Sequence, residues 1–388
     1  MTIAHIVRVV SGAGVAASLF YYVCATLTAL RFARKTREPA PPLPKIPPRV
    51  AFLKPLSGWS QRLTGNLVSH LEIAYPRVEY IFGVASYDDR AIEVPVGLRA
   101  PYQFAQIAVS VGEEPDCSNH KVAKLIRMAE RASEKTSIFV LSDADVTVER
   151  DLLRRLVGQL CADENLGVVT CVYRGIAEES IAARMEALFI NTDFVPQIIL
   201  SEAVEPMRHA LGATIAVRRE ALEAIGGFAA LRNLLADDFY LGRKVADKGW
   251  KVALSSSIVA IVCEEQTFSD FWTHQLRWAR TYRSVRPESI AAIIIHGFFW
   301  AILYTIASAF SLPAMIVLAA TVAVRVAMAS VITAKVLRLP ARMRDWWLVL
   351  FKDLVMTGIW FVSIAGNTVV WGGKRFRLLA HGEMREIG

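Results

Sequence analysis

The sequence predicts an α/β domain with a mostly parallel sheet, flanked at both ends of the chain by membrane helices. Two observations support this prediction. Hydrophobic residues make up 54% of the 388 residues, and the mean hydropathy of +0.36 is high for a water-soluble enzyme. The central part of the chain alternates between strand-like and helix-like segments, which is typical of a parallel sheet with helices on both faces.

The N-terminal apolar segment extends from Ile6 to Leu30 and contains one charged residue, Arg8. Because about 20 apolar residues are enough to cross a bilayer, residues 1–31 are predicted to form a membrane anchor. A secretory signal peptide is the alternative, although the segment is long and shows no small-residue cleavage site. Four basic residues follow it: Arg31, Arg34, Lys35 and Arg37. The positive-inside rule places this end in the cytoplasm, and residues 32–48 form a basic, proline-rich linker.

A second membrane region is predicted over residues 289–372. Its first part, residues 290–337, is almost entirely apolar and is long enough for two spans that break near Pro313. A third candidate segment, residues 348–371, contains two adjacent charges, Lys352 and Asp353, which weaken the prediction of a further span.

The basic segment after the third candidate leaves the C-terminal topology open. Residues 373–388 are predicted as a basic tail, which contains Lys374, Arg375 and Arg377. A complete third span would carry these cations to the non-cytoplasmic side, against the positive-inside rule. A re-entrant or interfacial segment is therefore the alternative to a span.

The formal net charge of +8 does not indicate a nucleic-acid partner. Many of the basic residues flank the apolar segments, where they would contact the anionic headgroups of the lipid bilayer. The five cysteines show neither a CxxC pair nor a zinc-ligand spacing, and a cytoplasmic domain would keep them reduced. The chain is expected to be a multi-pass membrane protein whose central domain is cytoplasmic.

The central domain is predicted over residues 49–288. Strand-like and helix-like segments alternate along its first half. The strand-like segments are residues 49–56, 78–89, 137–145 and 166–175, and the helix-like segments are residues 63–74, 119–132 and 150–160. Ligands of such sheets bind beyond the carboxyl ends of the parallel strands, so polar residues at those ends are candidate site residues.

Two strand-like segments end in pairs of acids. Asp143 and Asp145 stand one residue apart, and alternation in an extended chain places their side chains on the same side. One interpretation is a solvated turn before a helix, and the other is a site for Mg²⁺ or Mn²⁺. Asp88 and Asp89 form the second pair. Both pairs are expected at the ligand-binding edge of the sheet, which favours a cation and a nucleotide.

Common phosphate-binding and hydrolase motifs are missing from the sequence. No GxGxxG opens a helix, and neither GxxxxGK[ST] nor GxSxG occurs. A dinucleotide enzyme, a P-loop ATPase and an α/β-hydrolase are therefore disfavoured. Phosphates would instead contact a cation and basic side chains such as Lys54, Lys121 and Arg277.

A third acidic pair, Asp237 and Asp238, stands before the helix-like stretch FYLGRKVADKGW. One aspartate can cap that helix. The second is then left for general-base chemistry.

The order of these motifs resembles the ceramide glucosyltransferase family, which consists of membrane-bound inverting glycosyltransferases of the GT-A fold. The matching stretches include FLKPLSGWSQRLTGNLVSHLEIAYPRVEYIFGVASYDDRAIEV, NHKVAKL, LSDADVTV, GATIAVRREALEAIGGF, LADDFYLGRKVADKGW and HQLRWAR. They cover most of residues 50–285 in the family order. The resemblance implies a nucleotide-sugar-binding domain, a UDP-sugar donor, a divalent cation and a lipid alcohol acceptor.

The resemblance also implies roles for the first four acids. Asp89 matches the family aspartate that contacts the nucleotide, and Asp88 is its neighbour. Asp143 matches the second family aspartate, and Asp145 completes the metal-binding pair at the diphosphate.

The third acidic pair matches the position of the family's catalytic base. Asp238 is expected to be that base, with Asp237 at the position of the acid beside it. A single displacement by the lipid hydroxyl, without a covalent intermediate, would invert the anomeric centre.

Arg277 and Trp278 match the Arg-Trp of the family's (Gln/Arg)-x-x-Arg-Trp motif. Arg277 is expected to stabilise the diphosphate leaving group, whereas Trp278 stacks on the sugar, faces the lipid tail or belongs to the core. The first position of the motif is His274, with Gln275 one residue later. This departure leaves the role of position 274 undefined.

The acceptor and the sugar stay open at this level. UDP-glucose and ceramide are the first expectation, but bacterial relatives that act on hopanoids, including N-acetylglucosaminyl transfer, or on diacylglycerol share the same motifs. A degenerate, non-catalytic membrane scaffold is the alternative from another class, and acids at all three sites disfavour it. The expected location is a bacterial inner membrane.

Overall fold

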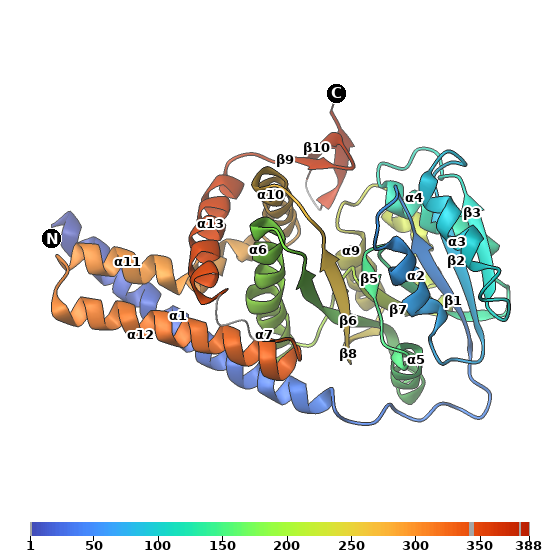
Figure 1. Cartoon of the computed structure of the whole chain (residues 1–388), viewed down its shortest axis with the longest axis horizontal. Coiled ribbons are helices and arrows are strands. Elements are labelled where there is room, and N and C mark those ends of the chain that lie inside the picture. The colour runs from blue at the N-terminus through green and yellow to red at the C-terminus, as the bar shows by residue number, and fades with distance from the viewer. Residues whose placement is uncertain (1, 341–344, 380–381, 388) are drawn as a thin grey trace.

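The computed structural model describes residues 2–340, 345–379 and 382–387. An α/β domain occupies one half of the molecule, and long apolar helices extend from it in the other half (Figure 1). The chain begins in these helices, passes through the α/β domain and returns to them. The predicted fold class, an α/β domain with apolar helices at both ends of the chain, is confirmed.

The central sheet has eight strands in the order β3-β2-β1-β4-β7-β6-β8-β5. Their bounds are β1 Arg49–Pro55, β2 Val78–Val84, β3 Gln106–Val111, β4 Thr136–Ser142, β5 Val146–Thr147, β6 Leu166–Ala177, β7 Thr214–Arg218 and β8 Lys251–Cys263. Strands β1 to β4 are parallel, as are β6 and β8, whereas β7 and β5 pair antiparallel to their neighbours. The sheet is therefore mixed and mostly parallel, and the carboxyl ends of β1, β2 and β4 meet at one edge.

Helices cover both faces of this sheet, which explains why β1 is buried at every position after Arg49. The helices of the domain are α2 Leu63–Leu71, η1 Arg90–Ile92, α3 Glu93–Leu98, α4 His120–Arg131, α5 Leu152–Ala162, α6 Ile181–Phe189, η2 Ile190–Phe194, α7 Val195–Val204, α8 Arg219–Ala224, η3 Phe228–Leu231, α9 Asp237–Asp247 and α10 Phe268–Val285.

Helix α4 shows how the sequence sets one of these elements. Asn119 caps it, because the side-chain oxygen accepts hydrogen bonds from the backbone amides of Lys121 and Val122 at 3.0 and 3.1 Å. Val122, Leu125 and Met128 recur at helical spacing and are completely buried. The cap thus fixes the start of the helix beside the carboxyl edge of the sheet.

Four helical segments are long and apolar enough to cross a membrane, or up to five with the bent pair Pro287–Ile295 and Gly297–Ala307, within the described residues. The four are Ile3–Lys35, Ile181–Val204, Leu312–Val336 and Trp346–Ile364. Half of the apolar window in Ile181–Val204 is buried, because α6 and α7 pack against the α/β domain. Composition alone therefore does not identify this segment as a span.

Helices α1 (Ile3–Lys35), α11 (Gly297–Ala307) and α12 (Leu312–Val331) pack side by side as a bundle (Figure 1). Tyr22 joins two of them, since its hydroxyl donates to the carbonyl of Ile295 at 2.7 Å and accepts from the amide of Gly297 at 3.0 Å. Helix α13 (Trp346–Ile364) instead runs across the axes of the bundle and beside α6 and α10. Its length and apolar composition are sufficient for a membrane span, so the choice between a span and an interfacial segment stays a prediction.

Four buried charges connect the bundle to the α/β domain. Arg325 of α12 is 1% exposed, and its guanidinium lies 2.8 Å from Asp353 and 2.6 Å from Asp193. Lys352 contacts the same two carboxylates, at 2.7 Å in the case of Asp353. Two cations and two anions thus form a neutral cluster, here called the charge cluster. Lys352 and Asp353, which weakened the prediction of an apolar segment, point into the protein and compensate each other.

The C-terminal segment, predicted as a basic tail, folds into a second sheet. Strands β9 (Thr368–Trp371), β10 (Lys374–Leu378) and β11 (Met384–Glu386) pair antiparallel in the order β11-β10-β9. The alternating side chains of β10 place Phe376 and Leu378 in a small core while its lysine and arginines face solvent. We call β9 to β11 the C-terminal sheet.

Candidate active site

Residues from three elements meet at the carboxyl edge of the sheet. Asp143 directly follows β4, Asp237 begins α9, and Lys121 lies in the first turn of α4. The ammonium of Lys121 lies 2.7 Å from Asp143 Oδ1 and 3.4 Å from Asp237 Oδ2. The nearby anions hold the pKa of Lys121 above its ordinary value despite its burial. The structure therefore brings together three residues that the sequence assigned to one site.

Gly212, the first residue of the stretch GATIAVRREALEAIGGF, lies between two of the acids, a role that was not predicted. A Cβ atom at this position would stand 3.0 Å from Asp238 Oδ2 and 3.6 Å from Asp143 Oδ2. The second and third acidic pairs are therefore neighbours across a glycine, although they are far apart in the sequence. Glycine keeps this space free for the two carboxylates, and nothing in the local sequence pattern shows it.

Two of the acids hold their protons more tightly than an ordinary aspartate does. Burial, followed by the charge of Asp237, raises the pKa of Asp238 to about 6, against the opposing effect of Lys121. The residue Asp145 is exposed as a whole, but neighbouring protein atoms displace water from its carboxylate. This desolvation, followed by the charge of Asp143, raises the pKa of Asp145 to about 6. A site that crowds anions in this way favours a positive ligand.

Lys54, expected to contact phosphates, lies beneath the site and is completely buried. Its ammonium donates hydrogen bonds to the carbonyl oxygens of Asp143 at 2.6 Å and Val146 at 3.2 Å, and it lies 3.3 Å from His70 Nε2. Asn66 donates to the carbonyl of Ala144 at 3.0 Å from the same side. These contacts fix the backbone that carries Asp143 and Asp145. Lys54 therefore positions the two acids through their backbone.

Asp89 and Asp88 lie beyond the end of β2, as predicted. The carboxylate of Asp89 accepts hydrogen bonds from the backbone amides of Gly58 and Ala91, each at 3.0 Å. Gly58 has a φ of +69°, so this contact fixes a loop conformation that favours glycine. Asp88 is exposed. Asp89 therefore shapes the loop after β1.

Helix α10 carries the last group of predicted residues. His274 forms an ion pair with Glu186 of α6, and its ring lies 5.2 Å from the ring of Trp278. Trp278 also contacts Phe189 and Phe194 at 6.1 and 6.2 Å. Trp278 thus belongs to an aromatic cluster and is half-buried. The partner of His274, Glu186, was not found from the sequence.

The side chains of Arg277 and Gln275 differ from these residues, because neither has a hydrogen-bond or ion-pair partner among the residues that the structure describes. Burial lowers the pKa of Arg277 to about 10, against the charges of Glu186 and Asp143. Its guanidinium forms no ion pair within the described part of the chain. Gln275 is 1% exposed, and neither its amide nitrogen nor its amide oxygen has a hydrogen-bond partner among the described residues.

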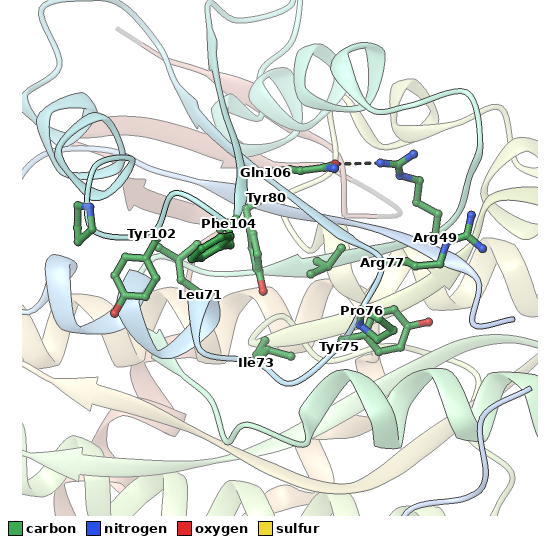
Figure 2. A pocket seen from close by; sticks show the side chains of 13 residues that line it. Arg49, Leu71, Ile73, Tyr75, Pro76, Arg77, Tyr80, Tyr102, Phe104 and Gln106 are labelled. Atoms are coloured by element: carbon green, nitrogen blue, oxygen red, sulfur yellow. Dashed lines mark hydrogen bonds between the residues drawn. The ribbon is translucent and has the colours of Figure 1, made fainter. Parts of the chain in front are cut away.

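A pocket of about 370 Å³ lies at the opposite, amino-terminal end of the parallel strands (Figure 2). Tyr75, Tyr80, Tyr102 and Phe104 line it, and Arg49 hydrogen-bonds Gln106 at 2.9 Å beside it. None of the predicted site residues lines this pocket. The acids at the carboxyl edge are therefore the stronger candidate for an active site.

The carboxylates are oxygen donors, which suit Mg²⁺ or Mn²⁺. Over residues 2–340, 345–379 and 382–387, no group of three or more His, Cys, Asp or Glu side chains is placed to hold a metal ion. Two carboxylates, those of Asp143 and Asp145, are enough for a cation that takes its remaining ligands from a bound diphosphate and from water.

Residues 11–384 match the sequence model of glycosyl transferase family 21. Ceramide glucosyltransferase 3 of Caenorhabditis elegans is 24% identical over 241 residues, which are 62% of this chain and 52% of that protein. Ceramide glucosyltransferase 1 of the same organism is 22% identical over 359 residues, which are 90% of this chain and 74% of that protein. The chain thus spans about half the length of the first of these relatives.

The fold has a counterpart among solved structures. The mannosyltransferase PcManGT from Pyrobaculum calidifontis, in complex with GDP-Man and Mn²⁺, has a TM-score of 0.56 and 19% sequence identity. The similarity covers 92% of this chain and 99% of that one.

The mixed sheet with acids at its carboxyl edge has the GT-A fold of the solved mannosyltransferase, and helices long and apolar enough to cross a membrane adjoin it. The chain belongs to glycosyl transferase family 21, the ceramide glucosyltransferase family. The family predicted from the order of the sequence motifs is thereby confirmed.

Proposed function

We propose that this protein transfers a hexose from a UDP-sugar, UDP-glucose in the first instance, to the hydroxyl group of ceramide. The observation that carries the proposal is the meeting of Asp143, Asp238 and Lys121 at the carboxyl edge of a GT-A sheet. Two relatives are named ceramide glucosyltransferases, which supports this donor and acceptor. The apolar helices beside the domain fit an acceptor that stays in the bilayer.

Asp143 and Asp145 would hold a divalent cation, which supplies positive charge to the diphosphate when bound. The solved mannosyltransferase was in complex with Mn²⁺, and the elevated pKa of Asp145 fits a site that a cation would stabilise. Arg277, whose side chain has no hydrogen-bond or ion-pair partner within the described residues, is proposed to contact the same diphosphate, and the charge of Asp143 acts on its guanidinium. Lys121 is a second cation within reach of Asp143.

Asp238 is proposed as the general base. The lipid oxygen forms a bond to the anomeric carbon while the bond from that carbon to the diphosphate oxygen breaks. Asp238 takes the hydroxyl proton, and the departing UDP keeps the electron pair. Because the hydroxyl attacks opposite the leaving group in one displacement, the anomeric configuration inverts.

The cytoplasm is proposed as the location of the α/β domain. Arg31, Arg34, Lys35 and Arg37 follow the apolar part of α1 on the side where the chain enters this domain. A bacterial inner membrane is the membrane we propose.

The function is tested with membranes that contain the full chain, labelled UDP-glucose or UDP-N-acetylglucosamine, and ceramide, diacylglycerol or a hopanoid polyol. We expect a glucosylceramide, identified by its mass, with the β-anomeric configuration seen by NMR. Formation of a glycosylated hopanoid or diacylglycerol instead would show that the acceptor is a different lipid and that the reaction class is as proposed. Absence of any glycolipid would contradict the proposal.

Two matched variants test the assignment of the base. Asp238→Asn should keep donor binding and lose about 10² to 10⁴ in kcat, because asparagine does not accept the hydroxyl proton. Asp237→Asn keeps a polar group beside Asn119 and Lys121, so more activity should remain. Normal turnover of Asp238→Asn with an inactive Asp237→Asn would show that the other acid is the base.

A further inference from the structure

The C-terminal sheet contacts two separate elements of the candidate active site. On one side it pairs with the loop before α9, where Leu234 and Glu383 form an antiparallel bridge. Two backbone hydrogen bonds accompany the bridge, from Leu235 to Gly382 at 3.1 Å and from Met384 to Asn233 at 2.9 Å. This loop leads directly into Asp237 and Asp238.

Side chains strengthen the same contact. Leu235 lies in one small buried core with Val369, Phe376, Leu378 and Met384 of the sheet. Gly382 packs so closely on the first turn of α9 that a Cβ atom would stand 2.5 Å from the ring of Tyr240. The loop before α9 is therefore held by backbone pairing and by apolar packing.

On its other side the C-terminal sheet is tied to α10, the helix that carries Arg277 and Trp278. Arg280 donates hydrogen bonds to the carbonyl oxygens of Thr368 and Ala365, the latter at 2.9 Å. Arg283 donates to the carbonyl of Gly366. Three backbone carbonyls at the start of the sheet thus accept from two arginines, spaced three residues apart on one side of α10.

We propose that the C-terminal sheet is a clasp that fixes the start of α9 relative to α10, and that Arg280 is a positioning residue for sugar transfer. The clasp sets the distance between the proposed base and the proposed diphosphate contact, which lie on different elements. Asn119 provides a third connection. Its side-chain amide donates a hydrogen bond to the carbonyl of Leu234 at 2.8 Å, and its side-chain oxygen caps α4, the helix that carries Lys121. This assignment of a role in transfer rests on the proposed function.

Arg280→Gln in the full chain tests the α10 side of the clasp. The hydrogen bonds of the Arg280 guanidinium go to Thr368 and Ala365. We nevertheless expect hydrogen–deuterium exchange of residues 233–240 to become faster, because these residues pair with the sheet that Arg280 holds. We also expect kcat to fall about 10- to 100-fold with little change in UDP affinity, since misplacement of reacting groups by about 1 Å costs this much. Arg385→Gln, the same change at an exposed position of β11, is the matched control.

Gly382→Ala tests the α9 side. Its matched control is Gly373→Ala, because both glycines have positive φ, of +72° and +76°, but only at Gly382 would the added atom meet another group. If the sheet acts as one clasp, the double variant Arg280→Gln/Gly382→Ala should show about the kcat of either single variant rather than the product of the two losses.

Unchanged exchange over residues 233–240 together with unchanged kcat in both single variants would overturn the clasp. Faster exchange confined to residues 365–371 would overturn it as well, since the contact would then be only local. The exchange measurement needs no substrate. A wild-type protein that transfers no sugar while Arg280→Gln loosens residues 233–240 would therefore contradict the proposed function and support the clasp.

Discussion

The ammonium of Lys54 donates a 2.6 Å hydrogen bond to the backbone carbonyl of Asp143, and no part of the Lys54 side chain reaches solvent. Burial lowers the pKa of Lys54 to about 7, against the charges of Asp145 and Asp143. The residue therefore supports the acidic turn from inside the protein, where its ammonium adds a hydrogen bond to the carbonyl of Asp143 beside the one from the backbone amide of Val146 at 3.2 Å.

Lys54→Met should weaken the acidic turn. The substitution removes the hydrogen bonds from the Lys54 ammonium to the carbonyls of Asp143 and Val146, and each such bond contributes about 1 kcal/mol. We expect a lower Tm and weaker binding of UDP in the presence of Mn²⁺, measured by calorimetry on the purified protein. Lys251→Met, at an exposed ion pair with Asp163, is the control. Unchanged UDP affinity would contradict the supporting role.

Asp145→Asn separates cation binding from stability. The variant should lose Mn²⁺-dependent UDP binding and transfer, as should the wild-type protein in EDTA. The pKa of Asp145 is raised to about 6, so its charged form is disfavoured in the folded state above that pH. Removal of the charge should therefore raise Tm at pH 8 and not at pH 4. Transfer that survives EDTA would show that the pair is only a solvated turn.

Transfer should depend on pH through Asp238. A base must be deprotonated to accept the hydroxyl proton, and the pKa of Asp238 is raised to about 6. We expect kcat/KM to be constant above pH 7 and to fall about tenfold per unit well below pH 6. Initial rates between pH 5 and 8 measure this limb. A profile without the acidic limb would argue against Asp238 as the base.

Gly212→Ala should impair turnover more than folding. The new methyl group would stand 3.0 Å from Asp238 Oδ2, so the carboxylate has to shift by a few tenths of an ångström. We expect kcat to fall about tenfold with a nearly unchanged Tm, because small displacements of reacting groups are costly. Gly65→Ala, on α2 with open space around it, is the control. A normal kcat would show that the acid tolerates the shift.

The charge cluster should be essential for stability. Asp193→Asn leaves Arg325 and Lys352 with one carboxylate, and removal of one partner from a buried ion pair costs about 3–5 kcal/mol. We expect a much lower Tm in detergent, followed by intrinsic fluorescence.

A second change should restore the charge balance of the cluster. Asp193→Asn combined with Lys352→Met leaves Arg325 paired with Asp353, so Tm should recover in part. A double variant less stable than Asp193→Asn would show that packing rather than charge controls this region.

Much of this protein follows from local patterns. Long apolar runs predict the membrane helices, and alternation of strand and helix signals predicts the sheet. The rule that ligands bind at the carboxyl ends of parallel strands predicts that the pairs Asp143/Asp145 and Asp88/Asp89 lie at one edge. Asp238 was instead assigned from its place before a helix and from the family motif. Each of these features depends on neighbouring residues or on a regular period, which the sequence displays directly.

Other features were decided only by the tertiary structure. Lys54 was expected to contact phosphates, yet it is buried beneath the acids. Gly212 separates acids that no sequence pattern connects, and the tail after residue 373 folds onto the start of α9. The sequence by itself determined the elements and the edge that carries the site. Which distant segments meet there, and which charges become buried, depends on contacts between residues far apart in the chain, and only packing in three dimensions sets these.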